Sequence, residues 1–559
     1  MAYLKSKTLF FTTSPRTPFK MIPEIQVLHD NFENKRWDTT TQVEFIKKLA
    51  EESTFDGKGS KKDMAFSARD RINRAPKALG FVDLKPNIRL TEVGEKFING
   101  KRAEEVLFRQ LLKFQLPSPY HKEPKEFKGT FCVKPYLEIF RLIYELGTIS
   151  FDELMIFGMQ LTHYNKFDSV VAEIKTFRRM KLYADFNYKT FRGKYLKEQI
   201  ERIYASEISE GSTKTRESRD KSIAKFVTTK SRNLRDYADA CFRYLRATGM
   251  VEISQRGHSI SIMPEKRKEI EFILSNIDRK PIYIADETNY KKYLFDGSIP
   301  ELYSDNRLRL IEQVKEVTGN GKGLEGYTTD ALKDILENAI ADKKKRIISK
   351  QTRELKEYKK YTDVMDTFDD IKNNVLYDAP LMLEWNTWRA MTMLDGGEVK
   401  ANLKLDDKGQ PMSTAAGNMS DIVCDYGDFG LAVEVTMQSG HRQYETEGEP
   451  VSRHLAKLKK ETGKEAYCLF IAPKINESCI AYFYALHTMN IAFYGGKSVI
   501  VPLELDVFIN MVEQSYGVGY VPNPQQVKGI FEYSLEQAQK AVDENEWYAK
   551  VKEKALNWL

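Results

Sequence analysis

Two acidic side chains, those of Asp421 and Glu434, belong to a segment whose residue pattern predicts a β-hairpin. A short apolar run at 422–424 is followed by a glycine-containing turn and an alternating run at 431–436, which is typical of two strands joined by a short connection. The hairpin would bring Asp421, at the start of its first strand, near Glu434, in the middle of its second. Carboxylates that converge in this way suit a hard divalent cation such as Mg²⁺, which activates water for the hydrolysis of a phosphodiester.

The same spacing also allows a purely structural role for both residues. Asp421 would then cap a turn, and Glu434 would lie on a solvated edge strand. Three further side chains bear on this choice, because each lies on a neighbouring segment: Glu384 on a mostly apolar upstream helix, Glu447 in the loop after the hairpin, and His454 on a helix predicted at 451–461. Glu384 faces either the solvent or the hairpin. His454 is either part of the same site or an ordinary histidine on a helix surface.

The segments around the hairpin alternate between strands and helices. Apolar runs predict strands at 467–472 and 498–503, and helical periodicity marks 478–489 and 534–559. Strands that alternate with helices indicate an α/β domain, and the carboxylates on its hairpin suggest a nuclease core.

Length and composition indicate a soluble protein of several domains. The chain has 559 residues, 42% apolar and 30% charged, and no run approaches the roughly 20 apolar residues of a membrane span. Its five cysteines form no CxxC pair, so neither a disulfide framework nor a zinc ribbon is indicated, and we expect a cytoplasmic protein. Residues 1–300 carry 55 basic and 40 acidic side chains, a net +15, whereas residues 301–559 carry 32 and 40, a net −8. We therefore expect the first half to grip a polyanion and the second half to do different work.

The basic half contains two outlines of a winged helix, in which a helix is followed by a two-stranded wing. In the first, Ser67 and Asp70 have the spacing of a capping box, in a helix that Pro76 kinks or ends. Residues 78–84 then indicate a helix end that runs into a strand, and 87–91 a second strand. Four cations crowd the place of a recognition helix: Arg69, Arg71, Arg74 and Lys77. They predict DNA contact, and a solvated basic face is the simpler alternative.

The second outline combines an amphipathic helix at 232–246 with a hairpin at 250–263. A polar stretch at 206–230 precedes it and lacks apolar periodicity, so we expect this stretch to be mobile until DNA phosphates order it. Candidate DNA-binding residues of this region are Lys214, Arg216, Arg219, Lys221, Arg232 and Arg235. From about 330 to 362 the chain is helical and charged, which predicts a linking helix or helical pair.

Several short blocks of the sequence resemble a family of restriction enzymes. They are Ser14-Pro15-Arg16, residues 66–71, Glu384 to Trp388, residues 415–418, Glu434 to Thr436, residues 447–454 and residues 468–473. These blocks and their order are similar to those of type IIS restriction endonucleases of the AlwI/MlyI/PleI group, including its strand-nicking relatives, and the architecture resembles that of FokI. The region 415–473 is the most specific part of this resemblance.

The resemblance implies a multidomain α/β fold. Its parts would be N-terminal winged-helix-like α+β DNA-recognition domains at 1–130 and 131–285, a helical linker at 286–365, and a C-terminal α/β nuclease core of the PD-(D/E)XK type at 366–559. Asp421 and Glu434 would be the metal-binding pair, Glu384 and Glu447 accessory acidic ligands, and His454 a further catalytic candidate. Two positions depart from the superfamily pattern: Ser420 replaces a proline, and Thr436 stands where a lysine usually orients the attacking water. The metal ion, Glu447 or His454 would then have to position that water.

The activity implied is Mg²⁺-dependent hydrolysis of a phosphodiester in double-stranded DNA, a few base pairs outside a short asymmetric site. A cognate methyltransferase would be a functional partner. Cutting both strands would need a second copy, a small catalytic subunit or sequential attack by one chain. No membrane partner is expected. Two alternatives stay open: a non-catalytic winged-helix DNA-binding regulator, and a repair nuclease that recognises DNA structure rather than sequence.

Overall fold

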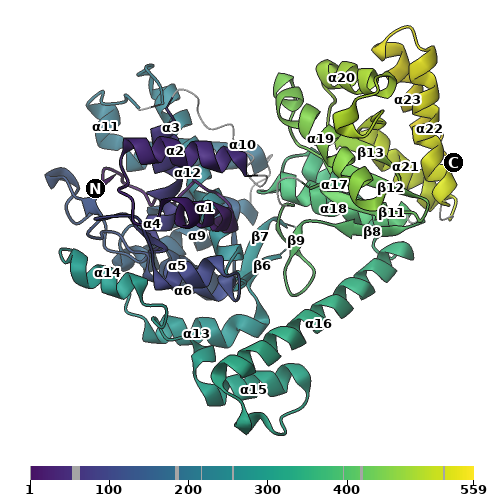
Figure 1. The fold of residues 1–559 in the computed structure, drawn as a ribbon. Coiled ribbons are helices and arrows are strands. Elements are labelled where there is room, and N and C mark those ends of the chain that lie inside the picture. Colours follow the sequence, from purple (N-terminus) through teal and green to yellow (C-terminus); the bar gives the residue numbers. More distant parts are fainter. Residues whose placement is uncertain are drawn as a thin grey trace. The chain divides into compact units, whose positions relative to one another are not determined.

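The computed structural model describes residues 2–52, 63–182, 188–215, 217–254, 257–394, 396–415, 419–519 and 523–559. The chain forms two compact units, Met1–Ala339 and Ile340–Leu559 (Figure 1). Both units contain helices and strands, which confirms the predicted mixed fold. The boundary between them lies inside one helix, α16 (Thr329–Lys356). None of the helices in the ranges above is long and apolar enough to span a membrane.

The N-terminal part of the first unit contains the first predicted wing. Its elements are β1 (Ala2–Tyr3), α1 (Met21–Phe32), α2 (Thr39–Glu51), α3 (Met64–Ile72), α4 (Ala75–Ala78), β2 (Val82–Asp83), β3 (Arg89–Leu90), α5 (Glu92–Ile98), α6 (Ala103–Lys113) and β4 (His121–Lys122). The predicted capping box at Ser67 is wrong, because Asp63 caps α3 and its side chain accepts a hydrogen bond from Phe66 N. Pro76 lies in the first turn of α4, where a missing N–H is tolerated. The wing strands β2 and β3 pair antiparallel.

The rest of the first unit contains a three-stranded antiparallel sheet in the order β5-β7-β6. Its strands are β5 (Thr148–Ser150), β6 (Val251–Ser254) and β7 (Ser259–Ile262), and the helices that precede or follow them are α7 (Pro135–Leu146), α8 (Phe151–Ile156) and α12 (Ile223–Arg246). The predicted hairpin is β6 and β7. α12 begins at Ile223, earlier than predicted, because Ser222 caps it through a hydrogen bond from Lys225 N and because Phe226 is buried. The described part of the polar stretch is therefore partly helical.

The remaining helices of the first unit are α9 (Phe167–Leu182), α10 (Tyr188–Ile203), α11 (Ala205–Ser209), α13 (Arg267–Asn276), α14 (Glu287–Phe295) and α15 (Arg307–Thr318). The segment predicted as a linking helix or helical pair, 330–362, is mostly one helix, since α16 ends at Lys356 and α17 (Tyr361–Lys372) begins only at the end of that segment. Between the two helices Tyr358 has a left-handed backbone, with φ of 55°, which an α-helix cannot continue through.

A five-stranded mixed sheet forms the centre of the second unit. Its order is β14-β13-β12-β11-β8, built from β8 (Glu398–Ala401), β11 (Ile422–Asp425), β12 (Phe429–Val435), β13 (Glu465–Ala472) and β14 (Ile500–Glu504). β8, β11 and β12 pair antiparallel, whereas β12, β13 and β14 run parallel. A separate short hairpin consists of β9 (Lys404–Leu405) and β10 (Pro411–Ser413). The predicted hairpin is β11 and β12, and β12 is a central strand buried on both faces.

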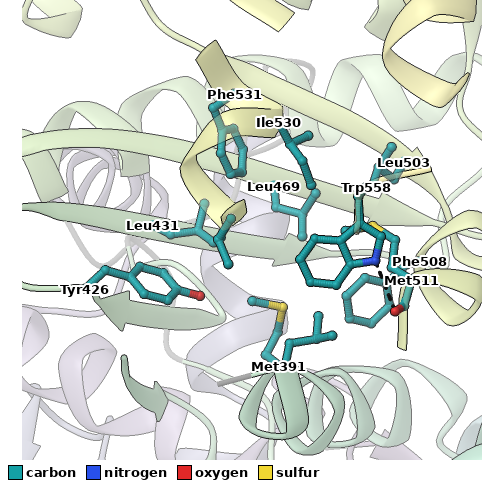
Figure 2. Close-up of a pocket in the computed structure, with 12 residues that line it drawn as sticks. Met391, Tyr426, Leu431, Leu469, Leu503, Phe508, Met511, Ile530, Phe531 and Trp558 are labelled. Carbon is teal, nitrogen blue, oxygen red and sulfur yellow. Dashed lines mark hydrogen bonds between the residues drawn. The ribbon is translucent and has the colours of Figure 1, made fainter. Parts of the chain in front are cut away.

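Helices cover both faces of this sheet: α18 (Ala379–Leu394), α19 (His441–Thr462), α20 (Glu477–Thr488), α21 (Leu505–Gly517), α22 (Pro524–Lys540) and α23 (Glu544–Leu556). On one face, Leu431 and Leu469 of the sheet meet Met391 of α18, Phe508 of α21 and Phe531 of α22 around a cavity of about 20 Å³ (Figure 2). The cavity has an apolar lining and room for about one water molecule. This face is therefore structural core.

The opposite face of the sheet is covered by α19 and α20. The ring of Phe470 on β13 lies 5.4 Å from that of Phe483 on α20, and Ala432 and Glu434 of β12 share this face with Phe470. α19 starts at His441 and contains Pro450, so the helix predicted at 451–461 is only its second half.

Candidate active site

Asp421 and Glu434 lie opposite each other at the end of the sheet where the parallel strands have their carboxyl termini. We use the word edge for this end of the sheet. Ile422 pairs with Val433, so the next residues of the two strands, Asp421 and Glu434, are cross-strand neighbours on one face. Asp421 Oδ2 accepts a hydrogen bond from Val435 N at 2.8 Å. Glu434 is only 6% exposed on a strand with neighbours on both sides, so the alternative of a solvated edge strand is wrong. Open α/β sheets bind their ligands outside the carboxyl ends of their strands, and this is that edge.

Glu384 reaches the same edge from α18. Its side chain is buried, and Oε1 accepts a hydrogen bond from Ala415 N at 2.8 Å. Burial raises the pKa of Glu384 well above its usual value, and the charges of Asp421 and Glu434 raise it further. Glu384 therefore faces the hairpin and not the solvent. Asp378, which directly precedes α18 and is 1% exposed, also raises this pKa, and the sequence did not single it out because an aspartate there is typical of a helix cap.

Glu447 lies on α19 and not, as predicted, in a loop. Its Oε1 accepts a hydrogen bond from Thr436 Oγ1 at 2.9 Å. The same hydroxyl accepts a hydrogen bond from Gln438 N at 3.1 Å. Thr436 thus orients a carboxylate, and its side chain supplies no positive charge.

His454 lies on the side of α19 that faces β12. Its Nδ1 is 2.9 Å from Glu434 Oε1, and 12% of its side chain is exposed. The alternative of an ordinary helix-surface histidine is therefore wrong. The imidazole is close enough to share a proton with Glu434, and its positive charge lowers the pKa of Glu447.

The four carboxylates of this edge hold their protons more tightly than ordinary acids. Burial raises the pKa of each, and repulsion from the others adds to the effect for Glu384, Asp421 and Glu434. Hydrogen bonds from main-chain and hydroxyl donors oppose it. Two cations oppose it as well: Arg453 lowers the pKa of Glu434, and His454 lowers the pKa of Glu447. We call this group, Glu384, Asp421, Glu434 and Glu447, the acidic edge; burial and mutual repulsion together disfavour its ionised form.

A family model matches the sequence over most of its length. The model of the AlwI restriction endonuclease matches residues 77–511, which include the whole acidic edge and His454. The chain belongs to the AlwI restriction endonuclease family. Membership supports a site-specific deoxyribonuclease that binds double-stranded DNA. No curated protein matches the chain. Among solved structures, the small subunit of the heterodimeric restriction endonuclease R.BspD6I is 28% identical over 34% of this chain and 98% of its own, with a TM-score of 0.29.

The acidic edge fits the divalent cation that restriction endonucleases typically use. Buried carboxylates with unbalanced repulsion are the donor set of a hard cation, which would relieve that repulsion. In the described ranges, no three Asp, Glu, His or Cys side chains are already gathered around one metal position. Mg²⁺ usually takes one or two protein carboxylates and completes its shell with water and phosphate. Asp421 and Glu434 match that demand.

Gln443, a buried side chain that the sequence did not single out, connects the segments that surround the acidic edge. Its Nε2 donates to Gln438 O and to Lys474 O, both at 2.9 Å, and its Oε1 accepts from Asn476 N at 2.7 Å. Gln443 is fully buried. It anchors the first turn of α19 to two loops, which explains why α19 starts before Pro450.

The four cations predicted to contact DNA from the first winged-helix outline have partners within the protein. The partners are Gln42 for Arg69, the buried Glu24 for Arg71, Asp70 for Arg74, and the ring of Tyr120 for Lys77. Burial lowers the pKa of Lys77. These side chains therefore do not form a simple solvated basic face. Any DNA contact that one of them made would compete with its contact to a partner within the protein.

The later cations differ, because they are exposed. Lys214, Arg219, Lys221, Arg232 and Arg235 make no side-chain hydrogen bond or ion pair with another residue in the part of the chain that the structure describes. Arg216 lies outside the described residues. Lys225, Thr228, Arg232 and Arg235 recur at helical spacing on one exposed face of α12, which we call the α12 stripe.

Proposed function

We propose that the chain is a type IIS restriction or strand-nicking endonuclease. Its N-terminal half would bind a short asymmetric site in double-stranded DNA, and its C-terminal unit would hydrolyse a phosphodiester a few base pairs away with Mg²⁺. The observation that carries this proposal is the cross-strand pair Asp421 and Glu434, buried with two further carboxylates and His454 at one edge of the sheet. Family membership supports the nuclease class.

The proposed architecture is that of winged-helix recognition domains joined to a PD-(D/E)XK-type core. The order α7, β5, α8, α12, β6, β7, with α9, α10 and α11 inserted between α8 and α12, and the sheet order β5-β7-β6 support a winged helix in which α12 is the third helix. The hairpin β11–β12 beside parallel β13 and β14 supports the nuclease core. We assign 1–130 and 131–285 to recognition, 286–365 to the linker and 366–559 to the nuclease.

The chemistry at the acidic edge divides among its side chains. When bound, Mg²⁺ neutralises phosphate charge and activates water. Asp421 and Glu434 would hold this ion, with Glu384 beside them, and His454 fixes Glu434 through their 2.9 Å contact. Glu447 takes up the proton of the attacking water, because a carboxylate with a raised pKa is a better base near neutral pH. The hydrogen bond from Thr436 orients Glu447 and replaces the positioning that a lysine gives elsewhere.

Recognition falls to the α12 stripe and the cations before it. An exposed helix face with cations at helical spacing suits entry into a DNA groove, where arginines can read guanine and lysines bind phosphates. Lys214, Arg219 and Lys221, whose side chains make no hydrogen bond or ion pair with another described residue, would contribute phosphate contacts. The cations of the first outline, Arg69, Arg71, Arg74 and Lys77, would add contacts only by exchanging their internal partners.

One acidic edge cuts one strand. Cleavage of both strands would require a second copy of the chain, a small catalytic subunit or sequential attack on the two strands, and without any of these the product is a nick. In a restriction–modification system a cognate methyltransferase would protect the host site. The protein would act in the cytoplasm, where this DNA is found.

The test is incubation of the purified protein with plasmids of known sequence, with and without Mg²⁺, followed by sequencing of the ends on both strands. We expect ends at a fixed offset from one short sequence, only with the metal ion. Ends that follow mismatches or branches would instead indicate a repair nuclease. Intact DNA that is nonetheless bound at a specific site would indicate a regulator.

A further inference from the structure

Two exposed cations, Arg442 and Lys474, lie on the segments that border the acidic edge. Lys474 follows β13 by two residues, and Arg442 lies in the first turn of α19. Neither side chain makes a hydrogen bond or ion pair with another residue within the described ranges. Several other cations of this unit pair along their own helices, as Arg453 does with Glu449 and Lys540 with Glu536. Arg442 and Lys474 are therefore available to a ligand.

Gln443 brings these two cations to the same place. It neighbours Arg442 in sequence, and its Nε2 lies 2.9 Å from the carbonyl oxygen of Lys474. The same amide holds Gln438, whose N–H fixes the Thr436 hydroxyl that donates to Glu447. One buried side chain thus ties both cations to the carboxylate that we assign as the base. The backbone that carries the two cations is therefore held close to the acidic edge.

The charge of the edge gives these cations a role. Once these carboxylates ionise, a DNA strand that approaches them meets like charge, and one bound Mg²⁺ would offset only part of that repulsion. Thr436 adds no positive charge where a lysine would. Free arginine and lysine side chains are the usual partners of phosphate oxygens, and such contacts set the register of the backbone. Neighbouring phosphates of the cleaved strand therefore need a cationic partner near this edge.

We propose that Arg442 and Lys474 form a phosphate clamp that binds the cleaved strand on either side of the scissile bond. Gln443 is the positioning residue of this clamp. The clamp rests on the proposed function, because its ligand is the DNA strand that the acidic edge cuts. It accounts for substrate positioning in a site without the superfamily lysine.

The test is single-turnover cleavage of short duplexes in which one phosphate at a time, along the cleaved strand, is replaced by a neutral methylphosphonate. At the two clamped phosphates we expect the wild-type rate to fall about tenfold, the value of one charge-assisted hydrogen bond. Lys474→Gln and Arg442→Gln should slow cleavage of the native duplex by a similar factor. Each should then be insensitive to methylphosphonate at its own phosphate, because the contact is already lost. Lys474→Arg and Arg442→Lys, which keep the charge, should retain most of the rate.

Lys497→Gln is the matched control. Lys497 is an exposed lysine before β14, at the opposite edge of the same sheet, and should keep both the rate and the sensitivity. The clamp would be overturned if the rate loss of each glutamine variant multiplied with the methylphosphonate loss at every phosphate. It would also be overturned if the glutamine variants cleaved at the wild-type rate. Wild-type protein that leaves the native duplex intact would overturn the proposed function itself, and the clamp with it.

Discussion

Replacing Arg71 with alanine should loosen the first unit before it affects DNA recognition. Arg71 pairs with Glu24 of α1, and 24% of the Arg71 side chain but only 6% of the Glu24 side chain is exposed. Burial already raises the pKa of Glu24, and Arg71 is the main influence that opposes it. Arg71→Ala would leave a buried carboxylate without its partner. The variant should therefore act through folding, whatever Arg71 does on DNA.

The size of the effect follows from this exposure. Removing one partner of a buried ion pair costs roughly 3–5 kcal/mol, and we expect about 2 kcal/mol here because solvent reaches part of Arg71. The sign depends on pH. A raised Glu24 pKa means that the folded state keeps a proton which the unfolded chain releases, so stability falls as pH rises through the raised pKa. Without Arg71 this pKa rises further, so the loss should be full at neutral pH and small at pH 4, below the usual glutamate pKa.

Native-state hydrogen exchange of α1 and α3 measures this locally. A loss of about 2 kcal/mol lowers amide protection about thirtyfold. Glu24→Gln in the same chain should restore most of it, because the double variant buries no unpaired charge. Arg69→Ala is the control, since Arg69 donates to the neutral Gln42 and should cost less. Unchanged protection in Arg71→Ala, together with a loss of site-specific DNA affinity, would refute this reasoning and make Arg71 a DNA-reading residue.

Three further predictions concern recognition and the acidic edge. Arg232→Ala or Arg235→Ala should weaken site-specific binding by about 1–3 kcal/mol if a base contact is lost and leave thermal stability unchanged. A binding titration in which either variant matches the wild-type affinity would show that another helix reads the DNA. Thr436→Val should slow single-turnover cleavage about 10- to 100-fold by freeing Glu447, as loss of a supporting hydrogen bond usually does, whereas Thr436→Ser should keep the rate; valine at the wild-type rate would contradict the role of this hydroxyl. Because the four carboxylate pKa values are raised, Mg²⁺ binding near neutral pH should release protons, and the number of protons released should fall as pH rises. The pH at which activity is lost on the acidic side should move lower at higher Mg²⁺ concentration. Calorimetry in two buffers of different ionisation enthalpy measures the release, and a value of zero would contradict the shifted pKa values.

The hairpin was predictable from sequence because its pattern is local. Alternation at 431–436 and the apolar run at 422–424 set the two strands, and their register then places Asp421 opposite Glu434. The burial of Glu434 was not predictable, because it depends on β13 pairing from the other side. Glu384 and His454 were candidates through family resemblance, and only the fold shows that both face the hairpin.

The errors have the opposite cause, since they arise from contacts between distant segments. Gln443 fixes the start of α19 through two loops, so the sequence before Pro450 did not predict a helix or place Glu447 on it. Similarly, the local density of cations around Arg71 could not show that Glu24, on another helix, neutralises one of them. Charge counts locate a basic region, but partner side chains decide which of its cations are free.

The claim that the acidic edge is the catalytic centre is tested most directly with Glu434→Gln. Glutamine keeps the size of the side chain and can still contact His454, but it removes the charge that would hold Mg²⁺. Cleavage and binding are measured on the same plasmid-derived duplex, with Mg²⁺ for the first and without it for the second. We predict no detectable cleavage of either strand and site-specific binding equal to that of the wild type. Cleavage at a rate comparable to the wild type would contradict the account.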